Sequence, residues 1–206
     1  MSLVSAVITD IRYEINDPSS TRWTTDAPIL AYIKRAVNRA NRICQRNSLQ
    51  FAKKKVTLTT VAGQAYVSLP TDFDIDIGLW RDSTHTKITK KTEAEWEQIV
   101  SATACANWML DLENNRLLLN GAPTDAETLT FYYYPAIDTS DYTTSTTMPW
   151  GGKLDDIIVD YVALRLKNLD EMEPTEDEKL LSDFENNIVQ AYNPLSPTIV
   201  EGAGWL

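Results

Sequence analysis

Three carboxylates at alternate positions have a spacing that could bind a metal ion. Asp72, Asp74 and Asp76 match the opening ligands of a calcium-binding loop. That loop also needs a glycine at its turn and a glutamate at its end, where this sequence has Ile77 and Ser83. We therefore interpret the aspartates as the solvated face of a strand, and we expect no metal site and no cofactor.

Other residue types that carry catalysis are sparse. His85 is the only histidine, and it lies in a polar segment with no cysteine or serine motif nearby. A catalytic histidine needs an oriented partner, and none is visible. The seven glycines are scattered and form no phosphate-binding loop. The sequence therefore gives no support to an enzyme.

Four arginines form the most informative charged feature. Their spacings of four, three and four residues place them on one stripe of a helix: Arg35, Arg39, Arg42 and Arg46. One interpretation is an ordinary solvated helix face, where cations near the carboxyl end are favoured by the helix dipole. The other is contact with an acidic surface, for which the acidic segment 171–178 of a neighbouring copy is a candidate. The sequence leaves both interpretations open.

Composition excludes several classes of protein. The formal net charge is −10, and hydrophobic residues make up 43% of the 206 residues, enough for a sizeable core. An acidic chain lacks the positive charge that non-specific nucleic-acid binding needs. We see no signal peptide and no stretch as long as a membrane span. We interpret Cys44 and Cys105 as buried thiols, with a disulfide as the alternative.

Helical periodicity predicts two helices before residue 50. The first, residues 3–15, is expected to be capped by Ser2 and stopped by Asn16-Asp17-Pro18. The second begins after Thr25 or Asp26 and carries the arginine stripe roughly opposite its apolar face.

Two more helices are expected after residue 150. The first, over about residues 154–169, has apolar side chains around most of its circumference, so we expect it at the centre of a helical bundle. The next opens near Thr175, which has capping-box spacing to Glu178, and ends at Asn193-Pro194.

Alternation of apolar and polar residues predicts a β-rich segment between the two helical regions. Strands over residues 56–60 and 66–69 are expected to pair as a hairpin about Ala62-Gly63-Gln64. A second hairpin is expected about Glu113-Asn114-Asn115.

Three further elements complete this segment. Over residues 73–79 every second residue is apolar, which predicts a strand with those residues facing a core. Thr92 and Glu95 have capping-box spacing and open a short helix. Aromatic residues predict a last strand over residues 128–134, ended by Pro135.

The order of elements indicates an α+β chain in which a four-helix bundle is interrupted by an inserted β-rich module and followed by an extended C-terminal tail. The expected parts are a discontinuous helical bundle (1–49 and 150–193), the β-rich module (50–135), a polar loop (136–149) and the tail (194–206). The loop is rich in threonine, serine and aspartate, so we expect it on the surface.

The tail has the composition of a docking segment. Pro197 keeps it from continuing the preceding helix. Ile199 and Val200 favour a strand that could add to a partner's sheet edge, and Trp205 and Leu206 are large apolar anchors. We expect the tail to be extended or mobile in isolation.

Several short motifs occur in a familiar order: Asn16-Asp17, Leu69-Pro70-x-Asp72-Phe73, Tyr133-Tyr134-Pro135, a Thr/Asp-rich loop, Met148-Pro149-Trp150 and a long helix. This order resembles the head-to-tail adaptor proteins of tailed bacteriophages, and is similar to the tail tubular protein A group of short-tailed phages. The resemblance covers most of the chain, and the sequence after Asn193 departs most from it.

The resemblance implies a structural virion protein of the tail or neck, made in the bacterial cytoplasm. Such adaptors form a ring, usually of twelve copies, under the portal protein, and their fold is a helical bundle with a β-rich insertion. They extend the DNA channel, without binding DNA specifically, and dock a tail or nozzle protein; no membrane is involved. The alternatives are another tail or baseplate subunit, or a ligand-binding or enzymatic module on the β insertion.

Overall fold

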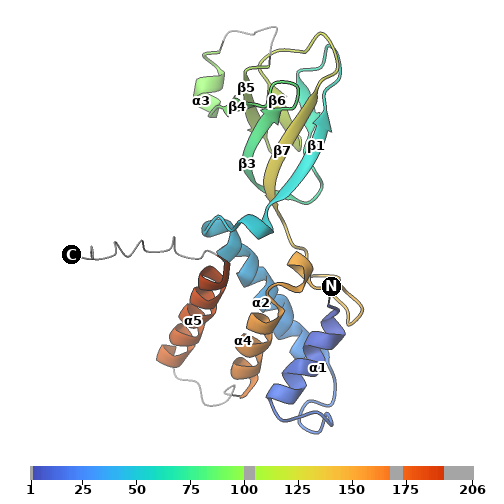
Figure 1. The fold of residues 1–206 in the computed structure, drawn as a ribbon, viewed down its shortest axis with the longest axis vertical. Helices are drawn as coiled ribbons and strands as arrows, with labels where there is room; N and C mark the ends of the chain where they lie inside the picture. The colour runs from blue at the N-terminus through green and yellow to red at the C-terminus, as the bar shows by residue number, and fades with distance from the viewer. Residues whose placement is uncertain (1, 100–104, 168–173, 193–206) are drawn as a thin grey trace, which may run out of the picture. The chain divides into compact units, whose positions relative to one another are not determined.

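The computed structural model describes residues 2–99, 105–167 and 174–192 of the chain. These residues form two compact units (Figure 1). One unit is helical and is built from the chain up to Ala52 and again from Ile137. The other, Lys53–Ala136, holds the strands. The predicted tail, residues 194–206, lies outside the described residues.

The helical unit is organised around α4. Its described helices are α1 (Val4–Glu14), α2 (Ala27–Arg46), α4 (Asp155–Lys167) and α5 (Pro174–Tyr192). In Figure 1, α4 lies between α1 and α5 while α2 crosses behind it, and α4 packs against all three. Ile158, Val162 and Leu166 of α4 are at most 1% exposed, because a spacing of four residues keeps them on one helix face.

The polar segment before α4 is hydrogen-bonded to the start of α1. The backbone N–H groups of Val4 and Ser5 donate to the carbonyls of Thr146 and Thr144, each at 2.9 Å. These N–H groups belong to the first helical turn and have no acceptor inside the helix. The predicted cap by Ser2 is therefore wrong: Leu3 holds the cap position without a capping side chain, and loop carbonyls take that role.

The loop between α1 and α2 is built around one carboxylate. Asp17 is 3% exposed and accepts the backbone N–H groups of residues 21–23 at 2.6–3.0 Å. Arg12 of α1 is 7% exposed and donates to Asp17 Oδ2 at 3.3 Å and to Asp26 Oδ1 at 2.7 Å. Asp26 holds the cap position of α2, but its side chain makes no cap hydrogen bond and binds Arg12 instead. Arg12 thus joins the loop to both helices.

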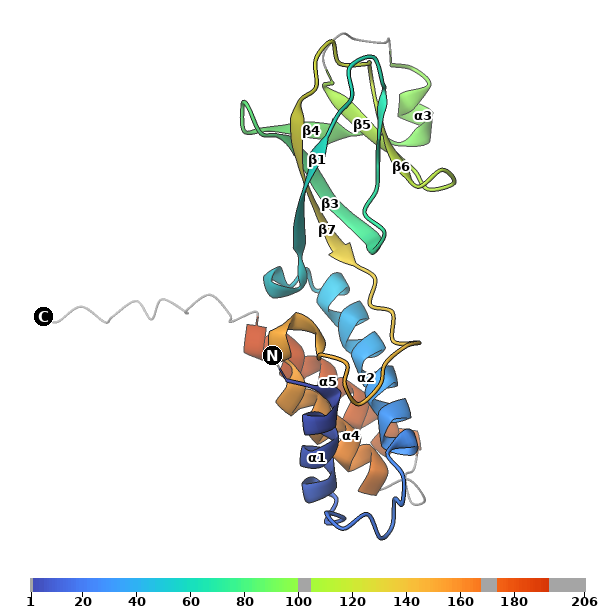
Figure 2. The same cartoon turned by 90° about the vertical axis from the view of Figure 1, so that its right-hand side faces the viewer.

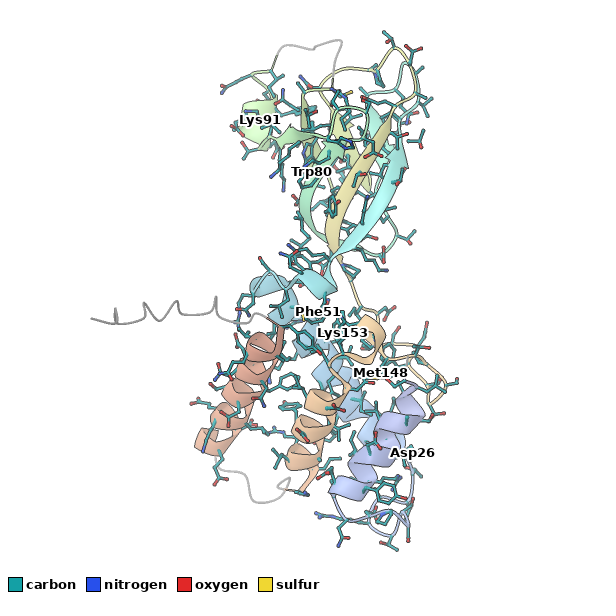
Figure 3. All side chains as sticks on the ribbon, viewed as in Figure 1. Asp26, Phe51, Trp80, Lys91, Met148 and Lys153 are labelled. Atoms are coloured by element: carbon teal, nitrogen blue, oxygen red, sulfur yellow. The ribbon has the colours of Figure 1, made fainter. Side chains whose placement is uncertain are left out.

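The end of α5 packs on the short 3₁₀ turn Gln50–Ala52. The rings of Phe51 and Tyr192 have centroids 4.4 Å apart, and Lys153 Nζ lies 5.5 Å from the Phe51 ring (Figure 3). The Tyr192 hydroxyl also donates to the Lys153 carbonyl. The last described turn of α5 is therefore fixed on the helical unit.

The described part of the β unit forms a seven-stranded, nearly closed, barrel-like sheet (Figure 2). The strand order is β1-β7-β3-β4-β5-β6-β2, so β1 and β2 are the edges. All neighbours are antiparallel except β4 and β5, which are parallel. The strands are β1 Lys54–Thr59, β2 Tyr66–Ser68, β3 Phe73–Arg81, β4 Thr86–Lys90, β5 Asn107–Asp111, β6 Arg116–Leu119 and β7 Thr128–Pro135.

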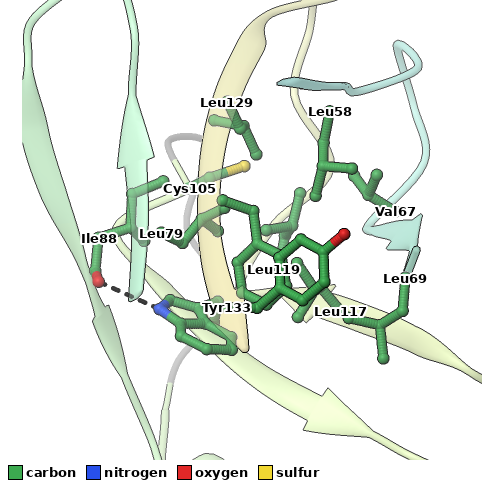
Figure 4. Packing of buried hydrophobic residues seen from close by; sticks show 12 residues of the cluster. Leu58, Val67, Leu69, Leu79, Ile88, Cys105, Leu117, Leu119, Leu129 and Tyr133 are labelled. Carbon is green, nitrogen blue, oxygen red and sulfur yellow. Dashed lines mark hydrogen bonds between the residues drawn. The ribbon is translucent and has the colours of Figure 1, made fainter. Parts of the chain in front are cut away.

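Aromatic and aliphatic side chains fill the inside of this sheet (Figure 4). Phe131 of β7 is fully buried, with its ring centroid 5.6 Å from that of Tyr133 and 6.0 Å from that of Trp108. The Trp108 indole N–H donates to the Ile88 carbonyl at 3.1 Å, which satisfies the one polar atom of that ring. β7 is buried along most of its length, because it pairs with β1 on one side and β3 on the other.

The expected four-helix bundle interrupted by a β-rich module is wrong. The described chain is α+β with five α-helices and the seven-stranded sheet above. The fifth helix, α3 (Glu93–Trp96), lies in the β unit and opens with the predicted Thr92–Glu95 capping box. Periodicity identifies local elements, but pairing between distant strands depends on the tertiary core, so the sequence pattern could not show one nearly closed sheet.

The two predicted hairpins have different outcomes. The one about Glu113-Asn114-Asn115 is confirmed, since β5 and β6 pair antiparallel. The one about Ala62-Gly63-Gln64 is wrong, because β1 pairs with β7 and β2 with β6. β7 offers a longer apolar partner to β1 than the three-residue β2 does.

β3 departs from the predicted alternation. Register shifts occur between Phe73 and Ile75 and between Asp76 and Gly78. Each shift changes which face of the sheet a side chain meets, so Ile75 is 44% exposed although its parity predicted a core position.

Candidate functional site

The arginine stripe borders a groove of about 990 Å³ in the helical unit. The described residues lining it come from α2, α4 and α5: Tyr32, Arg35, Asn38, Arg39, Arg42, Ile43, Arg46, Tyr161, Arg165, Asp177, Leu181, Ser182 and Glu185. We call the four exposed arginines of α2 the arginine face. The helix buries Ile33, Val37 and Ala40 on its opposite side, so the stripe is turned outward by the packing of α2.

The four arginines differ in their contacts. The Arg46 guanidinium forms an ion pair with Glu185 of α5. Arg39 Nη1 donates to the Tyr161 hydroxyl at 3.5 Å, a long hydrogen bond. Arg35 lies 5.4 Å from the ring centroid of its own neighbour on the helix, Tyr32. Arg42 has no hydrogen bond or ion pair within the described part of the chain.

Charge in the groove is unbalanced. Among its described lining residues are five arginines and two carboxylates, Asp177 and Glu185, a formal surplus of three positive charges. Each carboxylate already pairs with an arginine, Asp177 with Arg165 and Glu185 with Arg46. Guanidinium groups present a planar fork of donors that fits carboxylates. The groove is therefore suited to an acidic partner surface.

Sequence reasoning identified the arginines but missed the rest of the groove. Tyr161 and Arg165 of α4 and Leu181 and Glu185 of α5 form its other walls. Spacings of four residues within each helix could have grouped these pairs on one face, but only tertiary packing brings them opposite α2. The other predicted interface residues, Ile199, Val200, Trp205 and Leu206, lie outside the described residues.

Asp72 and Asp76, two of the three alternating aspartates, take part in ion pairs. Asp72 accepts from the Tyr133 hydroxyl at 2.7 Å and pairs with Lys54, while Asp76 pairs with Lys90 at 2.6 Å. Burial raises the pKa of Asp72, but the Lys54 and Tyr133 hydrogen bonds outweigh it and hold that pKa below its usual value. The described residues hold no group of three or more His, Cys, Asp or Glu side chains that could bind a metal ion.

The histidine is exposed, whereas both cysteines are buried. His85 is exposed in the turn between β3 and β4 and adopts a positive φ of 52°. Cys44 and Cys105 are both buried and free. Burial raises the pKa of the Cys44 thiol to about 12, and burial together with Glu127 raises that of Cys105 to about 11. Such thiols are poor nucleophiles, because the thiolate is the reactive form.

Within the described ranges, no helix has the length and apolar character needed to cross a membrane. A comparison with curated proteins gives no match. A model of the family described as SU10 adaptor protein matches residues 2–194. The chain belongs to the SU10 adaptor protein family.

Membership in this family confirms the resemblance to bacteriophage head-to-tail adaptors. An SU10 adaptor is a structural protein of the bacteriophage particle, and an adaptor role implies contact with portal and tail proteins. The family is structural and gives no support to enzymatic activity.

Proposed function

We propose that this SU10 adaptor forms a ring of twelve copies beneath the portal. The ring extends the DNA channel and docks the tail. The observation that carries the proposal is the arginine face of α2 in a chain with a formal net charge of −10. Copies with this charge repel one another at long range. A ring of such copies needs a local attraction, and the surplus cations of this face supply one.

The same charge fits a DNA channel. DNA passing through a ring of acidic subunits meets like charge, which disfavours adhesion. Repulsion between free copies also leads us to expect a monomer in isolation, with the ring forming on the portal. Ile199, Val200, Trp205 and Leu206 are proposed as a second contact with a partner.

Reconstitution on a portal protein tests this function. The protein would be mixed with the portal of the same phage and examined by co-sedimentation and negative-stain imaging. The expected result is a ring bound to the portal. If the protein neither forms rings nor binds that portal, the proposed function is wrong.

Charge reversal at Arg39 and Arg42 tests the role of the arginine face. R39E/R42E should lower the ring yield, most strongly at low salt, where surface electrostatics are least screened. The matched control is K55E/K179E, which changes the net charge equally. Lys55 and Lys179 are exposed and line none of the grooves discussed here, and neither has an ion pair with a described residue. An unchanged ring yield for R39E/R42E would identify the arginine face as an ordinary solvated surface.

A further inference from the structure

A second groove, of about 430 Å³, lies on the helical unit and carries the opposite charge. Its carboxylates are Glu14 of α1, Asp160 of α4 and Asp183 of α5, and its one cation among described lining residues is Lys167. We call these three carboxylates the acidic face. Leu164 is 45% exposed beside them. The surface therefore combines uncompensated negative charge with an exposed apolar side chain.

The two grooves lie on different sides of the same pair of helices. On α5, Leu181 and Glu185 line the arginine groove, whereas Asp183 and Asn187 line the acidic one. At 100° per residue these pairs project from roughly opposite sides of the helix. Tyr161 of α4 borders both grooves. One copy thus presents an arginine face on one side of α5 and an acidic face on the other.

Each face has at least one charged side chain with no partner among the described residues. Asp160 and Asp183 are exposed, and neither has a hydrogen bond or ion pair within the described residues. Glu14 reaches Lys167 only at 4.0 Å. Arg42 on the arginine face is likewise without a described partner. Each face therefore has groups available for a contact with the opposite charge.

We infer that the acidic face of one copy binds the arginine face of the next copy around the ring, an inference that rests on the proposed ring. Two complementary surfaces on different sides of one subunit make a head-to-tail contact, which generates a ring when the rotation between subunits closes. Carboxylates and guanidiniums of neighbouring copies then fix the register and orientation of the contact.

The partner is a second copy because each face is complemented by the other. DNA is excluded as the occupant of the acidic face, since its phosphates carry the same charge as Asp160 and Asp183. The apolar parts of the two surfaces also match in kind. Leu164 on the acidic face and Tyr32 and Tyr161 in the arginine groove can meet in the centre of the contact, where interfaces are depleted in charge.

Complementary charge reversal tests the inference. R39E/R42E carries acids on its altered α2 face, and D160K/D183K carries lysines on its altered acidic face. Either variant alone should give about tenfold fewer portal-templated rings than the unaltered protein, because like charges then meet at every contact. An equimolar mixture should recover to within about twofold, because copies can alternate so that every contact again joins opposite charges.

Native mass spectrometry of the mixture, with a mass tag on one variant, measures the yield and the alternation. Recovery in the mixture also shows that both variants fold. In the control mixture of K55E/K179E with D160K/D183K, rings should contain K55E/K179E alone, because the added acids lie outside the arginine face and cannot pair with the lysines of D160K/D183K.

Three results overturn the inference while leaving the proposed ring intact. In the first, D160K/D183K assembles alone as well as the unaltered protein does. In the second, both variants fail to assemble and their mixture also fails. In the third, R39E/R42E forms rings but no longer binds the portal or a DNA fragment, which would show that the arginine face binds that partner instead of a second copy. Failure of the unaltered protein to form rings or bind the portal is a separate result, and it overturns the proposed function as well.

Discussion

The rings of Tyr161 and Phe184 have centroids 4.3 Å apart and planes inclined by 32°. Phe184 is 2% exposed and lines the acidic groove, while Tyr161 is half-buried and borders both grooves. This α4–α5 pair therefore forms the wall between the arginine face and the acidic face. The shape of both surfaces depends on the packing of these two rings.

Truncation of Phe184 should destabilise the helical unit. F184A removes a buried ring and should lower the free energy of unfolding by about 3–5 kcal/mol. Y161F removes only the hydroxyl that accepts from Arg39 at 3.5 Å, and should change the free energy of unfolding by less than about 1 kcal/mol. Urea denaturation followed by far-ultraviolet circular dichroism measures both. Equal effects of the two variants would contradict this account of the wall.

Asp17 should make the α1–α2 loop sensitive to acid. The backbone N–H groups of Arg22 and Trp23 donate to its carboxylate and hold the pKa of Asp17 well below its usual range. D17N replaces one accepting oxygen with an amide that donates, so it should lower the urea midpoint at pH 7. T25A, at an exposed position of the same loop, is the control and should change the midpoint little.

The pH dependence of this effect has a defined sign. A folded-state pKa below the unfolded value of about 3.9 gives stabilisation that is fully present above that value and is lost as the pH falls toward the folded pKa. The difference in stability between the unaltered protein and D17N should therefore be constant above about pH 5 and shrink below about pH 4. A difference that grows on acidification would contradict the proposed role of the carboxylate.

Both cysteines should be unreactive in the folded protein. Burial raises the pKa of Cys44 to about 12, and that of Cys105 is raised to about 11, so the thiolate fraction at pH 8 is small for each. A disulfide-exchange reagent such as DTNB should label neither thiol in native buffer and both in denaturant. The denatured sample calibrates the assay, and rapid labelling of one thiol in native buffer would contradict the burial of that residue.

Local features of the fold could be predicted where they depend on residues close together in the sequence. The Thr92–Glu95 capping box and the hairpin about Glu113-Asn114-Asn115 depend on residues within a few positions of one another. The predicted strand over residues 128–134 is present as Thr128–Pro135 for the same reason, because its aromatic residues favour a strand. Its central place in the sheet was not predicted, since that depends on pairing with β1, about 75 positions earlier in the chain.

The same distinction applies to the candidate site. A spacing of three and four residues is enough to place Arg35, Arg39 and Arg42 on one helix face. The sequence of α5 indicates an acidic helix, but it does not show which carboxylates line which groove. Only the packing of α4 and α5 shows that Glu185 lines the arginine groove while Asp183 is on the other side.

Deletion of residues 195–206 should separate docking from folding. Ile199 and Val200 have the β-propensity to add a strand to a partner's sheet, and Trp205 is of the residue type most expected as an interface anchor. The last described turn of α5 is already fixed, because Tyr192 packs on Phe51. The truncated monomer should therefore keep its melting temperature and lose portal binding. W205A/L206A in the full chain is the finer variant and should also weaken portal binding.

The alternative is a segment that packs on its own subunit, and it predicts a clearly lower melting temperature after deletion. That result, or normal portal binding by the truncated protein, would show that the segment is not a docking tail.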